Sequence, residues 1–180
     1  KGEFEDEIIP VNGISEDGCI RPDTTLESMA QLKPAFDKEG VVTAGTSSPL
    51  TDGAAAVIVC SEDYAKSNKL KMLAYIRGMA ISGCSPEIMG IGPVVSSQKA
   101  LKRAGLKLED IDIIEMNEAF AAQSLACVDE LGIDMSKLNI HGGALAMGHP
   151  LGASGARITG KAASLLQNND AKYALSTMCV

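Results

Sequence analysis

Apolar and polar positions along the second half of the chain follow two alternating patterns. Short apolar runs, typical of buried strands, lie at 54–60, 73–81, 111–115, 138–140 and 173–180. Apolar residues spaced three to four apart predict helices over 94–104, 118–131 and 153–166. Strands that alternate with helices indicate the α/β class, as a layered αβα sandwich with a mixed, largely parallel sheet. In such folds ligands gather at the carboxyl ends of the strands.

The first part of the chain is more polar and less regular. Acidic residues surround Ile8-Ile9, where we expect one short exposed strand. Residues 24–32 are predicted to form a short surface helix, with Thr24 and Glu27 as a capping box. A further short strand is expected at 41–43, followed by a turn cluster.

The charge balance limits the classes of partner. There are 16 Lys and Arg residues against 23 Asp and Glu residues, which gives a net charge of −7. This balance argues against nucleic acid and against an anionic membrane surface as partners. Hydrophobic residues make up 46% and charged residues 22%, as in globular proteins. No apolar run approaches the roughly 18 residues that a membrane-spanning helix needs.

Cysteines, histidines and glycines exclude several kinds of site. The five cysteines never form a C-x-x-C pair, which argues against a zinc ribbon and favours a reducing compartment, so we expect a cytoplasmic location. Two histidines without a carboxylate cluster predict no metal site. Neither a phosphate-binding loop nor a complete dinucleotide fingerprint is present. Because the sequence begins at Lys1 and stops within a predicted strand at Val180, we expect a fragment.

Three loops after predicted strands carry residues suited to acyl transfer. They contain Asn117, His149 and Cys179, and in a parallel sheet they converge on one edge. Transfer through thioesters needs a thiol, an imidazole that titrates near neutrality and a donor for an oxyanion. Two of these residues also have a structural interpretation, Cys179 as a buried apolar side chain and Asn117 as a helix N-cap. The other histidine, His141, is expected to be structural, whereas His149 between Gly148 and Pro150 is equally compatible with a structural and a functional role.

Longer motifs resemble the C-terminal half of the thiolase family. They are Asn117-Glu-Ala-Phe-Ala-Ala-Gln123, the block from Ile140 to Arg157 with Gly-His-Pro at its centre, and Ser176-Thr-Met-Cys179. Shorter pieces in family order include Arg21 to Met29 and Met89-Gly-Ile-Gly-Pro93. This resemblance implies an acetyl-CoA acyltransferase that cleaves 3-ketoacyl-CoA with CoA, or condenses acetyl units in reverse.

The resemblance also implies roles for the three loop residues. Cys179 resembles the acid/base thiol that exchanges the α-proton and activates CoA, and His149 resembles the base that activates the nucleophilic cysteine. Asn117 resembles the residue that fixes a water, and with His149 it would form an oxyanion hole. The family's nucleophilic cysteine lies in the N-terminal half, so the resemblance implies half an active site in this chain.

Contacts to CoA carry over from the same resemblance. Residues that resemble those around the nucleotide and pantetheine are Arg21, Ser28 and Phe36. Residues that resemble the tunnel lining are Ala44, Ser48, Met89 and Phe120. The segment from Thr46 to Asp52 is more similar to degradative than to biosynthetic thiolases, because Pro49 and Thr51 replace a common Gly and Asn.

The resemblance divides the chain and implies its partners. Residues 1–69 would be a remnant of the loop domain and the end of the N-terminal domain, and residues 70–180 a C-terminal domain without its last strand. We expect no permanently bound cofactor, CoA and acetyl-CoA as substrates, a missing N-terminal half, and a homo-oligomer, either dimer or tetramer.

Two other functions remain open at this stage. One is a non-catalytic, thiolase-like subunit that binds acyl-CoA or assembles with a partner; retention of Cys179 and His149 argues against it. The other is a decarboxylating or initiating condensing enzyme of the same superfamily. That class generally carries a second histidine or an asparagine where this chain has the thiol of Cys179.

Overall fold

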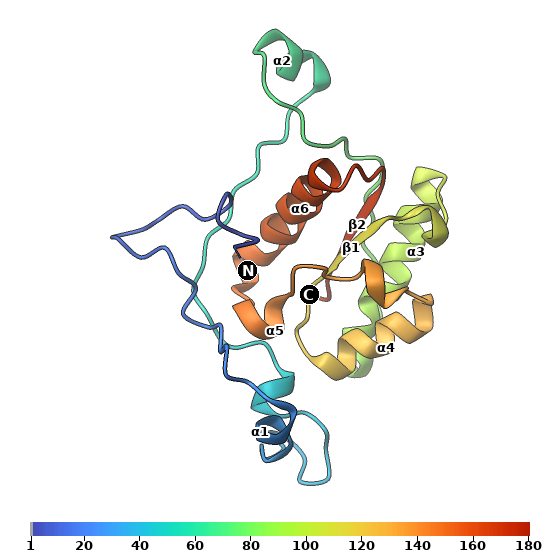
Figure 1. Ribbon diagram of the computed structural model, residues 1–180. Helices are drawn as coiled ribbons and strands as arrows, with labels where there is room; N and C mark the ends of the chain where they lie inside the picture. Colours follow the sequence, from blue (N-terminus) through green and yellow to red (C-terminus); the bar gives the residue numbers. More distant parts are fainter. Residues whose placement is uncertain (1) are drawn as a thin grey trace.

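The computed structural model describes residues 2–180 (Figure 1). Its two strands and six α-helices are joined by loops, four of which contain a short 3₁₀ turn. In chain order they are α1 (Leu26–Ala30), α2 (Glu62–Ser67), α3 (Gly92–Ala104), β1 (Ile113–Met116), α4 (Ala121–Leu131), α5 (Ala144–Met147), α6 (Leu151–Asn168) and β2 (Ala174–Thr177).

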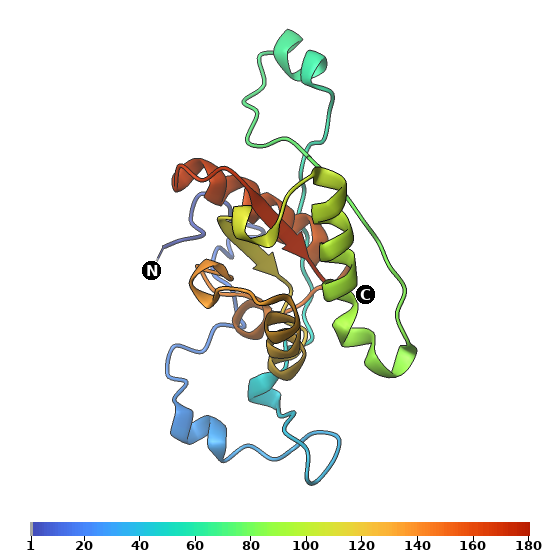
Figure 2. The ribbon, with the colours of Figure 1, turned by 90° about the vertical axis from the view of Figure 1, so that its right-hand side faces the viewer.

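The centre of the fold is a parallel pair of strands between two helical layers. β1 pairs with β2 in a register that places Ile113 opposite Ala174 and Met116 opposite Thr177. Leu138 adds a single parallel bridge to Ile114 on the other edge of β1. Helix α6 covers one face of the strands, and α3 and α4 lie on the other (Figures 1 and 2). The predicted α/β class with layered, parallel architecture is confirmed.

Hydrophobic burial explains why the strands and helices assemble in this way. All four residues of β1 are buried, as a strand covered on both faces requires. The core on the side of α3 and α4 consists of Val94, Leu101, Ile111, Ile114, Met116, Cys127, Val128, Ile133 and Leu175. Left-handed glycines end both helices of this layer, at Gly105 and Gly132, because only glycine adopts that conformation without strain.

Three expectations about the ends of helices need correction. The short helix α1 is present, but Thr25 is its N-cap and Ser28 completes the capping box, so the assignment to Thr24 and Glu27 was wrong. Helix α4 begins at Ala121 with Phe120 as N-cap. Asn117 is therefore not a helix cap and stays in the loop after β1.

The apolar runs at 54–60 and 73–81 do not form strands. A strand requires a neighbouring strand for its hydrogen bonds, and no described segment pairs with either run. Ile58 and Ile81 are consequently 85% and 88% exposed. The strands expected near residues 8–9, 41–43 and 138–140 reduce to isolated bridges at Val11, Thr43 and Leu138.

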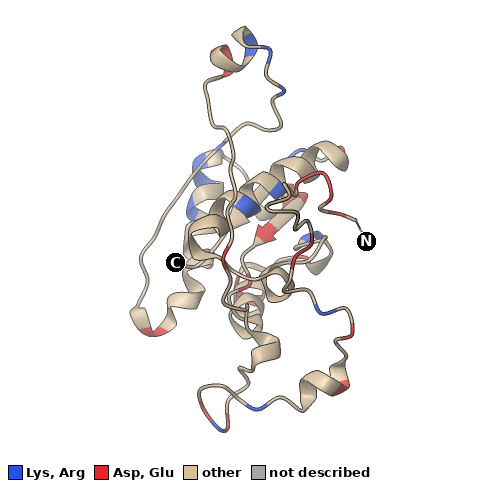
Figure 3. Ribbon diagram, turned by 90° about the vertical axis from the view of Figure 1, so that its left-hand side faces the viewer, with Lys and Arg blue, Asp and Glu red and all other residues tan. Residues whose placement is uncertain are grey.

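The periphery is held to the core by a few polar contacts. The buried ammonium of Lys161 on α6 lies 2.9 Å from a carboxylate oxygen of Glu7 and 4.0 Å from the ring centre of Phe4. Figure 3 shows the acidic N-terminal segment beside the basic residues of α6. Within residues 2–180, no helix combines the length and the apolar character needed to cross a membrane.

Candidate functional site

The carboxyl ends of the two paired strands bring two of the predicted residues to one edge of the sheet. Asn117 follows β1 directly, and its backbone N–H donates to the carbonyl of Thr177 at 3.0 Å. Cys179 lies two residues beyond that partner and is 6% exposed. The parallel register therefore places the amide and the thiol at the same end of the sheet, as expected from the sequence.

The Asn139 side chain fixes the end of β1. Its amide accepts from the N–H of Met116 and donates to the C=O of the same residue, each at 2.9 Å. In this way a side chain takes the place of a neighbouring strand beside the buried Met116. The backbone of Asn139 has a φ of 43°, a left-handed conformation that asparagine tolerates. Sequence reasoning missed this residue.

Glu118 joins the loop after β1 to the loop that precedes His149. One carboxylate oxygen accepts from the amide of Asn139 at 2.6 Å, and the other accepts from the backbone N–H of Leu145 at 3.1 Å. A Cβ on Gly143 would collide with this carboxylate, so glycine is needed at that position for the close approach. Glu118 and Gly143 thus set the distance between the two loops.

His149 is fixed by both of its neighbouring elements. Its Nδ1 lies 2.7 Å from Oγ of Ser154 on α6, and its backbone N–H donates to the carbonyl of Pro49 at 3.4 Å. The next residue on α6, Gly155, faces Met178, the residue that follows β2: a Cβ placed on Gly155 would lie 3.7 Å from Sδ of Met178. The first turns of α6 therefore contact both the imidazole and the residue that precedes Cys179.

The surroundings shift the thiol and the imidazole in opposite directions. Burial raises the pKa of the Cys179 thiol, and a charge on Cys84 adds to this effect. Burial also lowers the pKa of His149, and the charge of Arg157 lowers it further. Near neutral pH the thiol is protonated and the imidazole is neutral, so the site holds one proton donor and one base.

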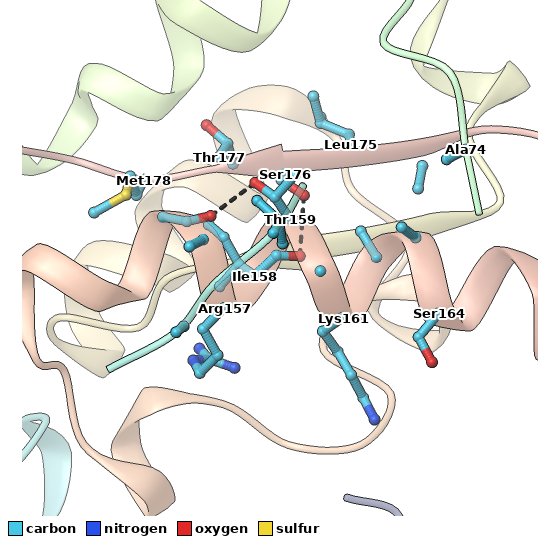
Figure 4. Close-up of a pocket in the computed structure, with 18 of the residues that line it drawn as sticks. Ala74, Arg157, Ile158, Thr159, Lys161, Ser164, Leu175, Ser176, Thr177 and Met178 are labelled. Carbon is cyan, nitrogen blue, oxygen red and sulfur yellow. Dashed lines mark hydrogen bonds between the residues drawn. The ribbon is translucent and has the colours of Figure 1, made fainter. Parts of the chain in front are cut away.

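Three buried polar side chains near the strand ends have atoms without protein partners. Both polar atoms of the Asn117 amide are buried without a hydrogen bond among the described residues. The guanidinium nitrogens of Arg157 and Oε1 of Glu115 are in the same condition. Figure 4 shows Arg157 pointing away from β2 on the far side of α6. Burial raises the pKa of Glu115 to about 7, against the opposing charges of Arg157 and Lys161.

The residues expected around CoA are only partly assembled. The rings of Phe36 and Phe120 meet edge to face with centres 6.4 Å apart, and Ser48 N–H donates to the carbonyl of Ala119 at 3.0 Å. These contacts bring part of the expected set beside the loop after β1. The others are exposed on separate segments, namely Arg21, Ser28 on α1, Ala44 and Met89.

Neither the second histidine, His141, nor any cluster of ligand side chains in the described residues indicates a metal centre. His141 lies 3.3 Å from a carboxylate oxygen of Glu3, which agrees with a structural role. Across residues 2–180, no group of three or more His, Cys, Asp or Glu side chains is placed to hold a metal ion.

Comparisons with known proteins give consistent results. The family model described as "Thiolase, C-terminal domain" matches residues 70–180, and "Thiolase, N-terminal domain" matches residues 1–63. A 3-ketoacyl-CoA thiolase of Vibrio parahaemolyticus is 53% identical over 100% of this chain and 49% of its own length. One of Salmonella typhimurium is 52% identical over 99% of the chain and 50% of its own length. The chain thus spans about half the length of the curated relatives it matches.

Solved structures agree with this similarity. Human mitochondrial 3-ketoacyl-CoA thiolase has a TM-score of 0.96 and 49% identity, and the match covers 99% of this chain and 47% of the human one. A structure of the same human protein in complex with CoA has a TM-score of 0.93 and 47% identity, over 99% and 46% of the two chains.

Proposed function

Because the chain belongs to the thiolase family, we propose that it supplies the acid/base half of an acyltransferase site for CoA thioesters. The reaction is thiolytic cleavage of 3-ketoacyl-CoA to acetyl-CoA and a shortened acyl-CoA, or the reverse Claisen condensation. The observation that carries this proposal is geometric: Asn117 and Cys179 lie at the carboxyl ends of the paired strands, and the His149 ring is held against Ser154 at the start of α6.

In this mechanism the base of the chain is His149 and the acid is Cys179. His149 takes the proton of the nucleophilic cysteine, which attacks the 3-keto carbonyl. As the carbon–carbon bond breaks, the electron pair passes to the acetyl-CoA enolate, and Cys179 protonates its α-carbon. The Cys179 thiolate then takes the proton of incoming CoA, whose sulfur attacks the acyl-enzyme. The nucleophilic cysteine leaves as a thiolate and regains its proton from His149, and the shortened acyl-CoA is released.

The unpartnered amide of Asn117 suits the remaining task. Its donor and acceptor are buried at the carboxyl end of β1 without protein partners. A buried polar group without a partner costs free energy, and a bound water would relieve that cost. We assign Asn117 to hold the water that, with His149, stabilises the enolate oxygen.

The proposal includes the partners and the place of action. The nucleophilic cysteine belongs to the N-terminal half of a thiolase, so the chain needs that half to complete the active site. Each copy of the completed site would then stand in a homo-oligomer. Residues 1–69 then belong to the loop and N-terminal domains, and residues 70–180 to the C-terminal domain. CoA is a substrate that contacts Phe36, Ser48 and Phe120, and the enzyme acts in the cytoplasm.

A thiolysis assay with acetoacetyl-CoA and CoA tests the proposal. The chain is measured alone and with the N-terminal half of a relative, and acetyl-CoA formation is followed. We expect turnover only in the combined sample, with a loss of about 10² to 10⁴-fold in Cys179→Ala. The matched control is Cys60→Ala, because Cys60 is exposed and far from the strand ends in sequence.

The competing functions give different outcomes in the same assay. Acyl-CoA binding that is unchanged in Cys179→Ala, without turnover in the combined sample, would identify a binding subunit instead. Use of a malonyl thioester but not of acetyl-CoA would identify a decarboxylating condensing enzyme.

A further inference from the structure

The hydroxyl of Ser154 connects the His149 ring to the start of α6. Ser154 is fully buried, and its Oγ lies 2.7 Å from Nδ1 of the imidazole. The same hydroxyl donates to the carbonyl of Pro150 at 3.2 Å, one helical turn earlier. Pro150 is the N-cap of α6, so the acceptor is fixed by the helix itself.

A hydroxyl has only one proton, and this decides the tautomer of the ring. If Ser154 donates to Pro150, its oxygen can only accept from Nδ1–H, and both short contacts are hydrogen bonds. If Nδ1 carried no proton, the hydroxyl would have to donate to the ring and would lose its bond to Pro150. The first arrangement makes two bonds and the second only one, so burial of Ser154 favours the first.

We propose that Ser154 is a positioning residue that keeps the His149 proton on Nδ1 and leaves the lone pair of Nε2 free. Among residues 2–180 no group forms a hydrogen bond with Nε2, so this nitrogen is available to an outside proton donor. The use of Nε2 as a base rests on the function proposed above. The tautomer does not, because it follows from the contacts of Ser154 and Pro150.

The tautomer is measured directly by NMR of the imidazole nitrogens. The chain has two histidines, so a sample labelled with ¹⁵N-histidine shows two rings, and His141→Gln identifies the remaining one. At about pH 8, where an ordinary imidazole is neutral, we expect the His149 spectrum of a protonated Nδ1 and an unprotonated Nε2. A protonated Nε2 in the unmodified chain overturns the proposal without any variant.

Two alanine variants on one helix then test the cause. Ser154→Ala removes the acceptor that Nδ1–H has among residues 2–180, and we expect the proton to move to Nε2 in most molecules. Ser164→Ala makes the same change on α6 but two to three turns away, and we expect the wild-type spectrum. Alanine favours helix, so circular dichroism should show α6 intact in both. An unchanged tautomer in Ser154→Ala would show that another group orients the ring.

A failure of the proposed function and a failure of the proposed role of Ser154 give different results. The NMR spectra need no turnover, no CoA and no N-terminal half. A chain with the expected tautomer that never becomes active would refute the proposed function alone. An active combined enzyme with a protonated Nε2 would refute the role of Ser154 alone.

Discussion

Removal of the Asn139 side chain should destabilise the fold by far more than an ordinary loop substitution. The amide makes two bonds to the buried backbone of Met116 and one to the carboxylate of Glu118. At about 1 kcal/mol for each neutral bond and about 2 kcal/mol for the charged one, Asn139→Gly should lower the free energy of unfolding by about 4 kcal/mol. Glycine is chosen because it adopts the positive φ of this position without strain.

Urea unfolding followed by circular dichroism measures this change. The control is Asn169→Gly, in which an exposed asparagine at the end of α6 loses one neutral bond to Leu165, and we expect a loss of about 1 kcal/mol or less. Hydrogen exchange gives a local readout, because the N–H of Met116 should lose its protection in Asn139→Gly. A destabilisation below about 1 kcal/mol, or an unchanged exchange rate at Met116, would refute the strand-like role of Asn139.

Three further predictions follow from other contacts. Gly143→Ala places a methyl group against the Glu118 carboxylate and should cost about 1–3 kcal/mol of unfolding free energy, whereas Gly152→Ala, which meets nothing within 4 Å, should be neutral or stabilising in the same urea titration. Burial raises the pKa of Glu115 to about 7, so the native state keeps a proton that the unfolded state loses near pH 4.5. The free energy of unfolding should therefore fall by about 3 kcal/mol as the pH rises from 4.5 to 7. Urea titrations at a series of pH values measure this fall, and Glu115→Gln should flatten it. Lys161→Met removes the anchor of the N-terminal segment and should speed proteolysis of the first ten residues, as mass spectrometry of the fragments would show, while circular dichroism of the core stays unchanged.

The sequence predicted α3, α4 and α6 well because a helix is a local structure. Its hydrogen bonds join residues four apart, so periodicity and end signals within one segment are enough. The strand pair was found for a related reason: β1 lies in a run that is apolar on both faces, as expected at the centre of a layered fold, and β2 lies in the last apolar run of the chain. The same reasoning was wrong for 54–60 and 73–81, since an apolar run becomes a strand only when another segment supplies its hydrogen bonds.

Within the candidate site, the sequence pointed to the three groups that we propose to react and missed two side chains that hold the surrounding loops. Asn139 lies just before the long motif from Ile140 to Arg157, and Ser154 lies inside that motif, but the roles of both depend on contacts 23 and 5 positions away that the motif does not reveal. A weak signal existed for each. Asn139 comes shortly before two glycines in a loop, and Ser154 lies in the first turns of a helix, where its hydroxyl can bond the preceding carbonyl.

Segment 47–53 contacts both loops of the candidate site, the loop after β1 and the loop that carries His149. Ser48 bonds the loop after β1 through Ala119, and Pro49 accepts from the backbone of His149. Gly53 approaches Pro150 so closely that a Cβ there would lie 2.7 Å from the ring, and Thr51 packs against Gly148 in the same way. Pro49 and Thr51, which the resemblance sets apart from biosynthetic thiolases, therefore contact the loop that carries His149, the proposed base. We therefore expect a substitution at Pro49 or Thr51 to shift His149 relative to Asn117, and so to affect the proposed chemistry as well as the fit of the proposed substrate.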